Sequence, residues 1–296
     1  MRLHPDQILS FVEVVRQGSI GGAAKARHLT QPAVSNQLRQ LQQDIGEELY
    51  RRQGRGVALT ATGEAFYAHA LAVEQALQAA TTFAEGLHGL QAGRVRVASS
   101  QTIAGSLLPA VLAAFQQRHP GIEVHVGTSN SRQVINSLGD YDIGLVESPL
   151  PRQVPDTYRA EPIGQDEVVL VMPAGHRLAR RDSVPLSMLR DQPLIWREPG
   201  SGTSEVVEDA FRRAGIVVSR HLSLGGVAAV LEAVRQGLGL GFASHLTLKR
   251  ADAVLVARPL SPRLLRPFTM LVAAHPSPAA RAFADFLAAH LPAPPA

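Results

Sequence analysis

Apolar residues recur at helical spacing in the first part of this 296-residue chain. A first stripe ends near Gly18 and consists of Ile8, Phe11, Val12 and Val15. A second stripe follows Thr30, with steps of four, three and four residues, and consists of Val34, Leu38, Leu41 and Ile45. Between them Ser19 is a suitable cap for a short helix containing Ala23 and Ala24. The pattern predicts a helix-turn-helix.

The helix after Thr30 has a polar outer face. Thr30 is a suitable N-cap, and Pro32 fits the first turn, where its missing N–H costs little. Gln31, Ser35 and Arg39 recur every four residues on the side opposite the apolar stripe. Such a helix suits insertion into a DNA major groove. The alternative is that Gln31 and Ser35 only cap the helix.

Two further elements follow. Short extended pieces flank a turn rich in Gly and Arg between Leu49 and Thr60, which is typical of a β-wing. A long helix rich in alanine then runs from Thr60 to about Gly86. Its small residues favour close approach of a second helix, so we expect a linker and dimerisation helix; a buried core helix is the alternative.

Beyond Gly93, strand-like runs alternate with helical ones. The expected strands are Arg94–Ser99, Ile122–Val126, Asp142–Val146, Glu167–Met172, Leu238–Ala243 and Phe268–Ala274. One intervening helix ends at His119, and another runs from Thr203 to Gly215. Such alternation predicts a parallel sheet with crossover helices, and its length predicts two α/β lobes.

Composition limits the kind of protein. Hydrophobic residues make up 45% and charged residues 18%, which is typical of a globular chain. The absence of cysteine excludes disulfides and thiolate sites. Neither a secretory signal nor a membrane-spanning stretch is visible, so we expect a cytoplasmic protein. Net charge is +4, and residues 1–62 carry 8 Lys/Arg against 5 Asp/Glu, an excess that fits contact with phosphates.

The N-terminal residues resemble the LysR-type bacterial transcriptional regulators. The residues that carry this resemblance are Phe11, Gly18-Ser19, Ala23-Ala24, Leu29, Gln31 to Ser35, Gln37-Leu38, Leu41, Gly46, Leu49, Arg52, Arg55, Val57, Leu59-Thr60 and Gly63. Gln42 and Tyr50 depart from the family's usual Glu and Phe. Trp196 to Thr203 is similar to a subgroup that includes regulators of carbon fixation and sulfur assimilation.

The resemblance implies an α+β multidomain fold with a two-lobed α/β effector domain like the periplasmic solute-binding proteins. We expect a winged helix-turn-helix over residues 1–60, a linker helix over 61–90 and the effector domain over 91–296. Lobe I is expected at about 91–163 and 267–296, and lobe II at about 164–266. The implied protein is a homodimer or homotetramer on double-stranded promoter DNA, controlled by a small-molecule effector.

The predicted DNA-binding residues lie on the recognition helix and the wing. Gln31 and Ser35 are expected to reach base edges, and Arg39 a base or a phosphate. Arg52 and Arg55 are expected to meet backbone phosphates or the minor groove. Pro32 and Asn36 complete this set at the start of the helix.

Hydroxyl-rich segments predict the effector site. They follow strands or open helices, where ligands collect in α/β sheets and where free N–H groups favour anions. We expect a small polar anion held by Ser99, Ser100, Thr102, Asn130, Ser201 and Thr203. For each residue the alternative is helix capping. Arg197 would suit an anion, whereas Glu147 and Glu198 would suit a ligand hydroxyl or ammonium group.

An enzyme is not favoured by the motifs. Gly200 to Thr203 lacks the lysine and the spacing of a P-loop, and Gly237 to Phe242 fails the dinucleotide fingerprint. No nucleophile elbow or paired-histidine motif is found, so neither a cofactor nor a metal is predicted. A solute-binding receptor fits the C-terminal part alone, and the helix-turn-helix counts against it.

Overall fold

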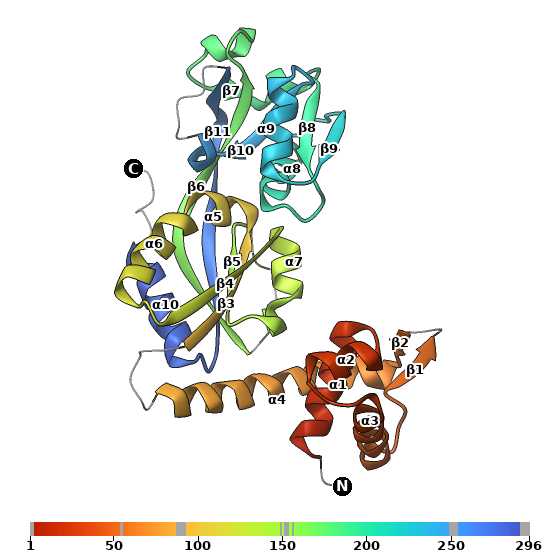
Figure 1. The fold of residues 1–296 in the computed structure, drawn as a ribbon. Helices are drawn as coiled ribbons and strands as arrows, with labels where there is room; N and C mark the ends of the chain where they lie inside the picture. Colours follow the sequence, from red (N-terminus) through yellow and green to blue (C-terminus); the bar gives the residue numbers. More distant parts are fainter. Residues whose placement is uncertain are drawn as a thin grey trace. The chain divides into compact units, whose positions relative to one another are not determined.

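The computed structural model describes residues 3–53, 56–86, 93–148, 150, 154–155, 157–248 and 254–290. The chain forms two compact units, residues 1–84 and 85–296, which are described separately (Figure 1). Within the described ranges no helix is long and apolar enough to cross a membrane.

The N-terminal unit begins with three helices, α1 (Pro5–Gln17), α2 (Ile20–Ala26) and α3 (Gln31–Ile45). Local signals set their ends. Gly18 ends α1 in the left-handed region at φ 65°, and the Ser19 side chain accepts from the Gly22 N–H at the start of α2. The Thr30 hydroxyl accepts from the Ala33 N–H, and Gly46 ends α3 at φ 83°. The predicted helix-turn-helix is confirmed.

A single apolar core joins these helices to the wing. Val34, Leu38 and Leu41 are fully buried, as the stripe predicts, and so is Phe11 on α1. The wing consists of β1 (Tyr50–Gln53) and β2 (Gly56–Leu59), which pair antiparallel with Tyr50 opposite Leu59. The long helix α4 (Ala61–Gly86) follows the wing directly.

Only part of α4 is buried. Ala70 is fully buried, and the Phe66 ring lies 5.6 Å from that of Phe11. Farther along, an ion pair of 3.0 Å joins Glu74 to Arg16 on α1. On either side of this ion pair along α4, small side chains are exposed at Ala72, Ala76 and Ala80. The helix is thus only partly buried, and its role as a linker and dimerisation helix remains a prediction.

The second unit contains one mixed sheet of nine strands in the described ranges, ordered β4-β3-β5-β11-β6-β10-β8-β9, with β7 paired to β11. The strands are β3 (Gly93–Ser100), β4 (Ile122–Ser129), β5 (Ile143–Val146), β6 (Tyr158–Pro173), β7 (Val184–Pro185), β8 (Leu194–Arg197), β9 (Leu222–Leu224), β10 (Leu240–Ser244) and β11 (Leu255–Ala273). The α-helices are α5 (Gln101–Ser106), α6 (Leu108–Arg118), α7 (Ser131–Asn136), α8 (Gly202–Arg213), α9 (Val227–Arg235) and α10 (Pro278–His290).

Two long strands, β6 and β11, run through both lobes (Figure 1). They pair antiparallel from Tyr158 opposite Ala273 to Pro173 opposite Leu255. We call the part built on β3–β5, α5–α7 and α10 lobe I, and the part built on β7–β10, α8 and α9 lobe II. Each has its own core, around Phe115 and Phe283 in lobe I and around Trp196 and Phe242 in lobe II.

The predicted sheet needs correction. Strands β3, β4 and β5 are parallel, as are β10, β8 and β9, but β11 is antiparallel to both β5 and β6. Glu167–Met172 and Phe268–Ala274 overlap only part of β6 and β11. The other parts of these strands carry exposed residues, so their apolar pattern is interrupted.

Three short strands are absent from the sequence prediction. Strands β7, β8 and β9 have only 2, 4 and 3 residues. The expected strand at Leu238 begins later, at Leu240, because Gly237 has φ 76° and Leu238 is 51% exposed. Short strands depend on partners distant in sequence, which local periodicity does not reveal.

Candidate DNA interface and effector site

Helix α3 presents the predicted polar face to solvent. Gln31, Pro32, Asn36 and Arg39 are exposed, and Ser35 is half-buried. Because Thr30 caps the helix, Gln31 and Ser35 are not needed for that role. These four exposed side chains in the first nine residues of α3 are therefore available to a partner.

Polar contacts fix α3 against the first two helices. The Ser10 hydroxyl, fully buried on α1, donates to Gln37 Oε1 and accepts from Arg27 of the α2–α3 turn. Gln7 Nε2 donates to Gln40 Oε1 at 3.1 Å. No local sequence signal points to this set, because its members lie on three segments of the chain. They hold the recognition helix in a fixed orientation.

The wing is tied to α3 by one of the residues that depart from the family pattern. Gln42 Oε1 accepts from the Leu49 N–H at 2.9 Å, a contact that a glutamate oxygen would make equally well. Arg52 lies in β1, and Arg55 falls outside the described residues. Arg51 is exposed beside Glu48, with 3.8 Å between the charged atoms.

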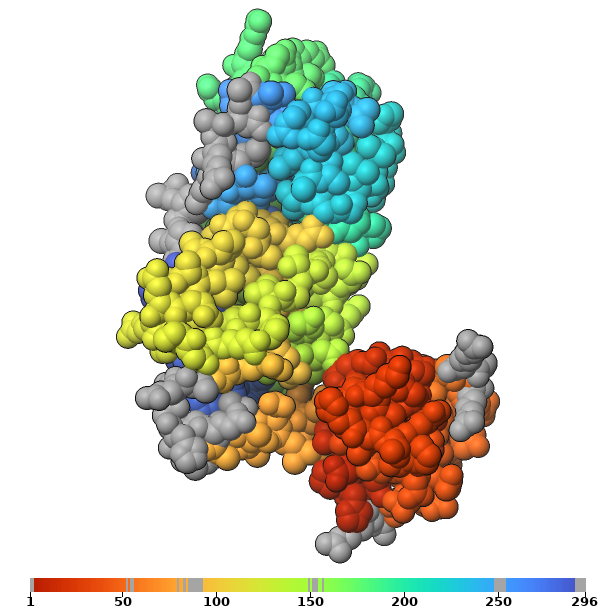
Figure 2. All heavy atoms as spheres, viewed as in Figure 1, coloured from red at the N-terminus to blue at the C-terminus, as the bar shows by residue number. Residues whose placement is uncertain are grey.

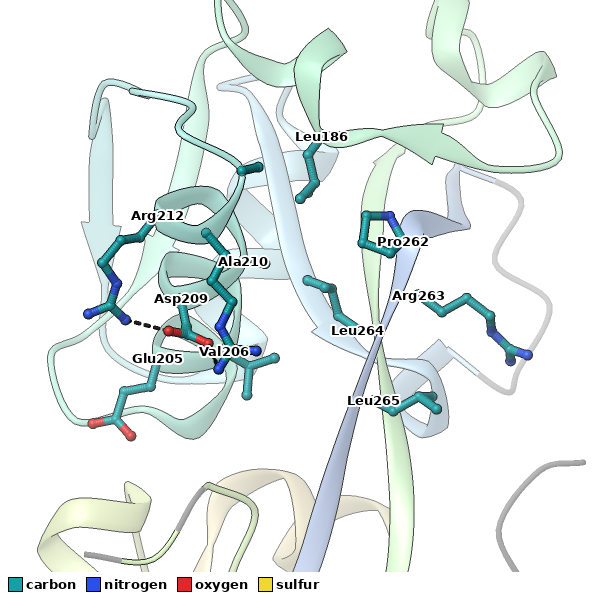
Figure 3. Close-up of a pocket in the computed structure, with 12 residues that line it drawn as sticks. Leu186, Glu205, Val206, Asp209, Ala210, Arg212, Pro262, Arg263, Leu264 and Leu265 are labelled. Carbon is teal, nitrogen blue, oxygen red and sulfur yellow. Dashed lines mark hydrogen bonds and ion pairs between the residues drawn. The ribbon is translucent and has the colours of Figure 1, made fainter.

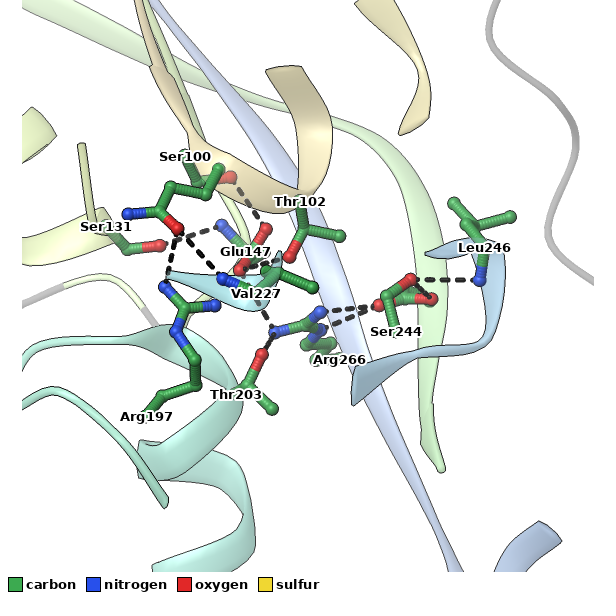
Figure 4. A network of polar contacts seen from close by, with 12 residues as sticks. Ser100, Thr102, Ser131, Glu147, Arg197, Thr203, Val227, Ser244, Leu246 and Arg266 are labelled. Carbon is green, nitrogen blue, oxygen red and sulfur yellow. Dashed lines mark hydrogen bonds and ion pairs between the residues drawn. The ribbon is translucent and has the colours of Figure 1, made fainter. Parts of the chain in front are cut away.

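In the second unit, three of the predicted effector residues meet in one buried polar network (Figure 4). The hydroxyls of Ser100 and Thr102 donate to the two oxygens of Glu147 at 2.6 and 2.8 Å. Arg266 Nη1 donates to Thr203 Oγ1 at 3.0 Å and lies 3.4 Å from Glu147 Oε1. All five side chains are almost fully buried. The network therefore joins lobe I, lobe II and a connecting strand.

The two connecting strands position the centre of this network. Arg266 on β11 lies opposite Asp166 on β6, and two of its nitrogens donate to Asp166 Oδ2 at 2.9 and 2.7 Å. The Ser244 hydroxyl donates to the other Asp166 oxygen at 2.8 Å. A buried carboxylate needs such partners because desolvation penalises its charge. One arginine and three hydroxyls thus stabilise the two buried carboxylates Asp166 and Glu147.

A second cluster lies at the start of α9. Arg197 donates to both oxygens of Glu198 at 2.8 Å, and the Gly226 N–H donates to Glu198 Oε2 at 3.1 Å. Gln101 Oε1 from lobe I accepts from Arg197 Nη2 and from the Val227 N–H, both at 3.2 Å. Burial alone would raise the pKa of Glu198, but the Arg197 guanidinium and the Gly226 N–H together lower it below its ordinary value. Glu198 therefore remains an anion and occupies the helix terminus.

The remaining predicted residues lie beside these clusters. Asn130 caps α7 through its oxygen, and its nitrogen donates to the Pro199 carbonyl at 3.4 Å. The Ser99 hydroxyl donates to the neighbouring Ser100 carbonyl at 3.1 Å. Within the described chain, Ser201 Oγ and Arg197 Nη1 are buried without a hydrogen-bond partner. Buried groups of this kind are uncommon, and either a water molecule or a ligand would satisfy them.

Sequence reasoning missed Asp166, Ser244 and Arg266. The sequence gives little signal for them, since Arg266 follows Arg263 by three residues and Asp166 is one of two adjacent acidic residues before an apolar run. On the face shown in Figure 2, atoms of lobe I and lobe II are in direct contact. The network residues are accordingly buried between the lobes.

A separate cavity of about 810 Å³ lies in lobe II, between α8 and the bend of β11 (Figure 3). Its lining includes the apolar side chains of Val206 and Leu264. The arginines around it are balanced by carboxylates: Arg212 and Arg213 pair with Asp209, and Arg263 pairs with Glu167. This cavity is a weaker candidate for a small anion than the network between the lobes.

Comparison with known families decides the assignment. Residues 5–64 match the model described as the bacterial regulatory helix-turn-helix protein, lysR family, and residues 88–292 match the LysR substrate binding domain. The chain belongs to the LysR family. The predicted family and fold class are thereby confirmed. Our own domain limits, which differ from these ranges by several residues, remain predictions.

Individual relatives of this LysR-family chain are regulators. It is 33% identical over 243 residues to the RuBisCO operon transcriptional regulator of Allochromatium vinosum, covering 82% of this chain and 80% of the relative. The predicted similarity to carbon-fixation regulators is confirmed.

Solved structures show the same fold. A full-length OxyR variant from Pseudomonas aeruginosa superposes with a TM-score of 0.78 at 20% identity, covering 98% of this chain and 94% of that one. The regulatory domain of Synechocystis PCC6803 CcmR, solved in complex with 2-PG, has a TM-score of 0.61 at 28% identity. That match covers 67% of this chain and 96% of the CcmR domain.

Proposed function

We propose that this LysR-family protein is a transcriptional regulator that binds duplex promoter DNA and responds to a small anionic ligand held between its lobes. The observation that carries the proposal is the joining of two family domains in one chain, a helix-turn-helix and a substrate binding domain. The relatives named above regulate transcription, so we assign a regulatory role in the cytoplasm and no catalytic one.

The start of α3 is the proposed base-reading surface. Gln31 and Ser35 would contact base edges, with Pro32 and Asn36 beside them, and Arg39 would reach a base or a phosphate. The exposure of these side chains supports the assignment. Arg52 and Arg55 of the wing would contact phosphates, which fix the orientation of the protein without reading sequence.

The effector is proposed to bind where the lobes meet. The residues assigned to it are Ser99, Ser100, Thr102, Asn130, Ser201 and Thr203. Support comes from Arg197 Nη1 and Ser201 Oγ, two buried donors without partners among the described residues. The CcmR regulatory domain, a relative at 28% identity, holds the small molecule 2-PG. A ligand that binds one arrangement of the lobes more tightly would shift the population of DNA-binding states.

Two or four copies are proposed to act together. The exposed alanines of α4 offer a surface on which a second α4 can pack closely. A dimer would place two copies of α3 on neighbouring half-sites of an imperfect palindrome.

Operator binding at several salt concentrations tests the DNA assignment. Gln31→Ala should cost about 1–3 kcal/mol and loosen sequence specificity, because it removes a base contact. Arg55→Ala should weaken binding to all sequences alike and reduce the salt dependence. Gln43→Ala, an exposed glutamine at the far end of α3, is the matched control and should bind like the unmodified chain. Identical behaviour of the Gln31 and Arg55 variants would contradict the assignment.

A further inference from the structure

The protons of two hydroxyls assigned to the proposed effector site are already engaged in hydrogen bonds. A serine or threonine hydroxyl carries one proton and two lone pairs. Ser100 Oγ donates its proton to Glu147 Oε2 at 2.6 Å, and Thr102 Oγ1 donates to Glu147 Oε1 at 2.8 Å. These hydroxyls can therefore only accept a hydrogen bond from a ligand. A bare oxyanion, in contrast, requires hydrogen-bond donors.

Glu147 is held in place from several sides. Arg266 Nη1 lies 3.4 Å from its Oε1 and is itself anchored by Asp166. The first residue of α8 packs directly against it, because a Cβ on Gly202 would lie 2.9 Å from Glu147 Cγ. These contacts hold the carboxylate where it accepts the protons of both hydroxyls.

The donors for an anion lie elsewhere in the site. Arg197 Nη1 and Ser201 Oγ are buried, have no hydrogen-bond partner within the described residues, and come from lobe II. Figure 4 shows the Arg197 guanidinium pointing toward the region of Ser131 and Glu147. The site thus has a donor side at Arg197 and Ser201 and an acceptor side at Ser100 and Thr102.

We infer that Glu147 is a specificity-determining residue, which makes the site select anions that also carry hydroxyl groups over anions that carry none. The inference rests on the proposed effector control and adds the class of ligand to it. A ligand hydroxyl donates to Ser100 or Thr102, whereas an apolar group or a second anionic oxygen leaves those oxygens without a donor. One such buried hydrogen bond corresponds to about a tenfold difference in affinity.

Calorimetric titration of the full-length protein with two matched probes tests this selectivity. The probes are sn-glycerol 3-phosphate and propyl phosphate, which share the anionic group and the three-carbon chain and differ in hydroxyls. The unmodified protein should bind the glycerol ester about tenfold more tightly. In Glu147→Gln the amide donates to one hydroxyl and frees its proton, so the preference should fall to near unity. Glu205→Gln removes an exposed carboxylate that pairs with Arg132 at 2.7 Å across the lobes, and this control should keep the preference.

The outcomes distinguish a role of Glu147 in ligand specificity from a purely structural role. If Glu147 were only structural, its substitution would weaken both probes by the same factor, and the inference would be overturned. Equal binding of the two probes by the unmodified protein would overturn it while leaving effector control intact. If neither probe binds, the inference and the proposed anionic effector fail together.

If Glu147→Gln does not fold, Thr102→Val tests the inference instead. This variant should weaken binding of the glycerol ester and leave binding of propyl phosphate unchanged. Equal weakening of both would contradict the inference.

Discussion

Arg266 shows how much of the second unit depends on one side chain. It is fully buried, it lies on a strand shared by both lobes, and it contacts Asp166, Glu147 and Thr203. A buried ion pair is weak as a source of stability, but removing one partner leaves an uncompensated charge. Because two carboxylates depend on this single guanidinium, its loss affects both.

Arg266→Met should therefore lower the free energy of unfolding of the second unit by about 3–5 kcal/mol. Urea denaturation followed by tryptophan fluorescence measures this, since the only tryptophan, Trp196, is buried in lobe II. Arg94→Met is the control, because its ion pair with Glu123 is largely exposed and should contribute little. Equal stability of the two variants would show that the carboxylates find other partners.

At the level of elements, the junction of the wing and α4 leaves no room for a side chain at residue 63. Gly63 lies in the first turn of α4, and a Cβ placed on it would be 1.8 Å from the Leu49 carbonyl oxygen. The same region is held by the Thr60 N–H, which donates to that carbonyl at 3.1 Å. Only a residue without a side chain allows α4 to begin so close to the wing.

Gly63→Ala should destabilise the N-terminal unit by more than the roughly 1 kcal/mol typical of a point substitution, because backbone atoms must move. Gly21→Ala in α2 is the matched control: a Cβ there meets nothing within 4 Å, so it should be neutral or slightly stabilising. Thermal unfolding of the two variants, followed by helical circular dichroism, distinguishes them. A Gly63 variant as stable as the control would mean that the junction relaxes freely.

Elements also differ in how far the sequence predicts them. The ends of α1, α2 and α3 follow from Gly18, Ser19 and Thr30, which act within a few residues of themselves. Strands β6 and β11 were recognised only in part, because their pairing joins residues about a hundred positions apart, such as Asp166 and Arg266. The same separation in sequence limits prediction of the site. The hydroxyls of Ser100 and Thr102 could be proposed from local pattern, whereas Arg266, which contacts the carboxylate they share, could not.

At the scale of the whole molecule, we propose that the regulator assembles through α4. The exposed face of this helix offers small side chains, and a charge within a helix–helix contact must be desolvated. Ala76→Glu should therefore shift the protein toward monomer in sedimentation velocity and weaken binding to a two-half-site operator. Thr81→Glu, exposed and on a different side of the helix, should leave assembly unchanged. An Ala76 variant that assembles normally would place the contact elsewhere.

Because β6 and β11 are paired where they pass between the lobes, lobe II can be exchanged as a unit in protein engineering. Lobe II is an insertion within the chain of lobe I, and it enters and leaves at hydrogen-bonded neighbours, with Gly164 opposite Phe268. A segment whose two ends lie next to each other can be replaced without changing the path of the remaining chain. Exchange of lobe II would thus transfer the proposed ligand donors Arg197 and Ser201 and leave Ser100 and Thr102 in place.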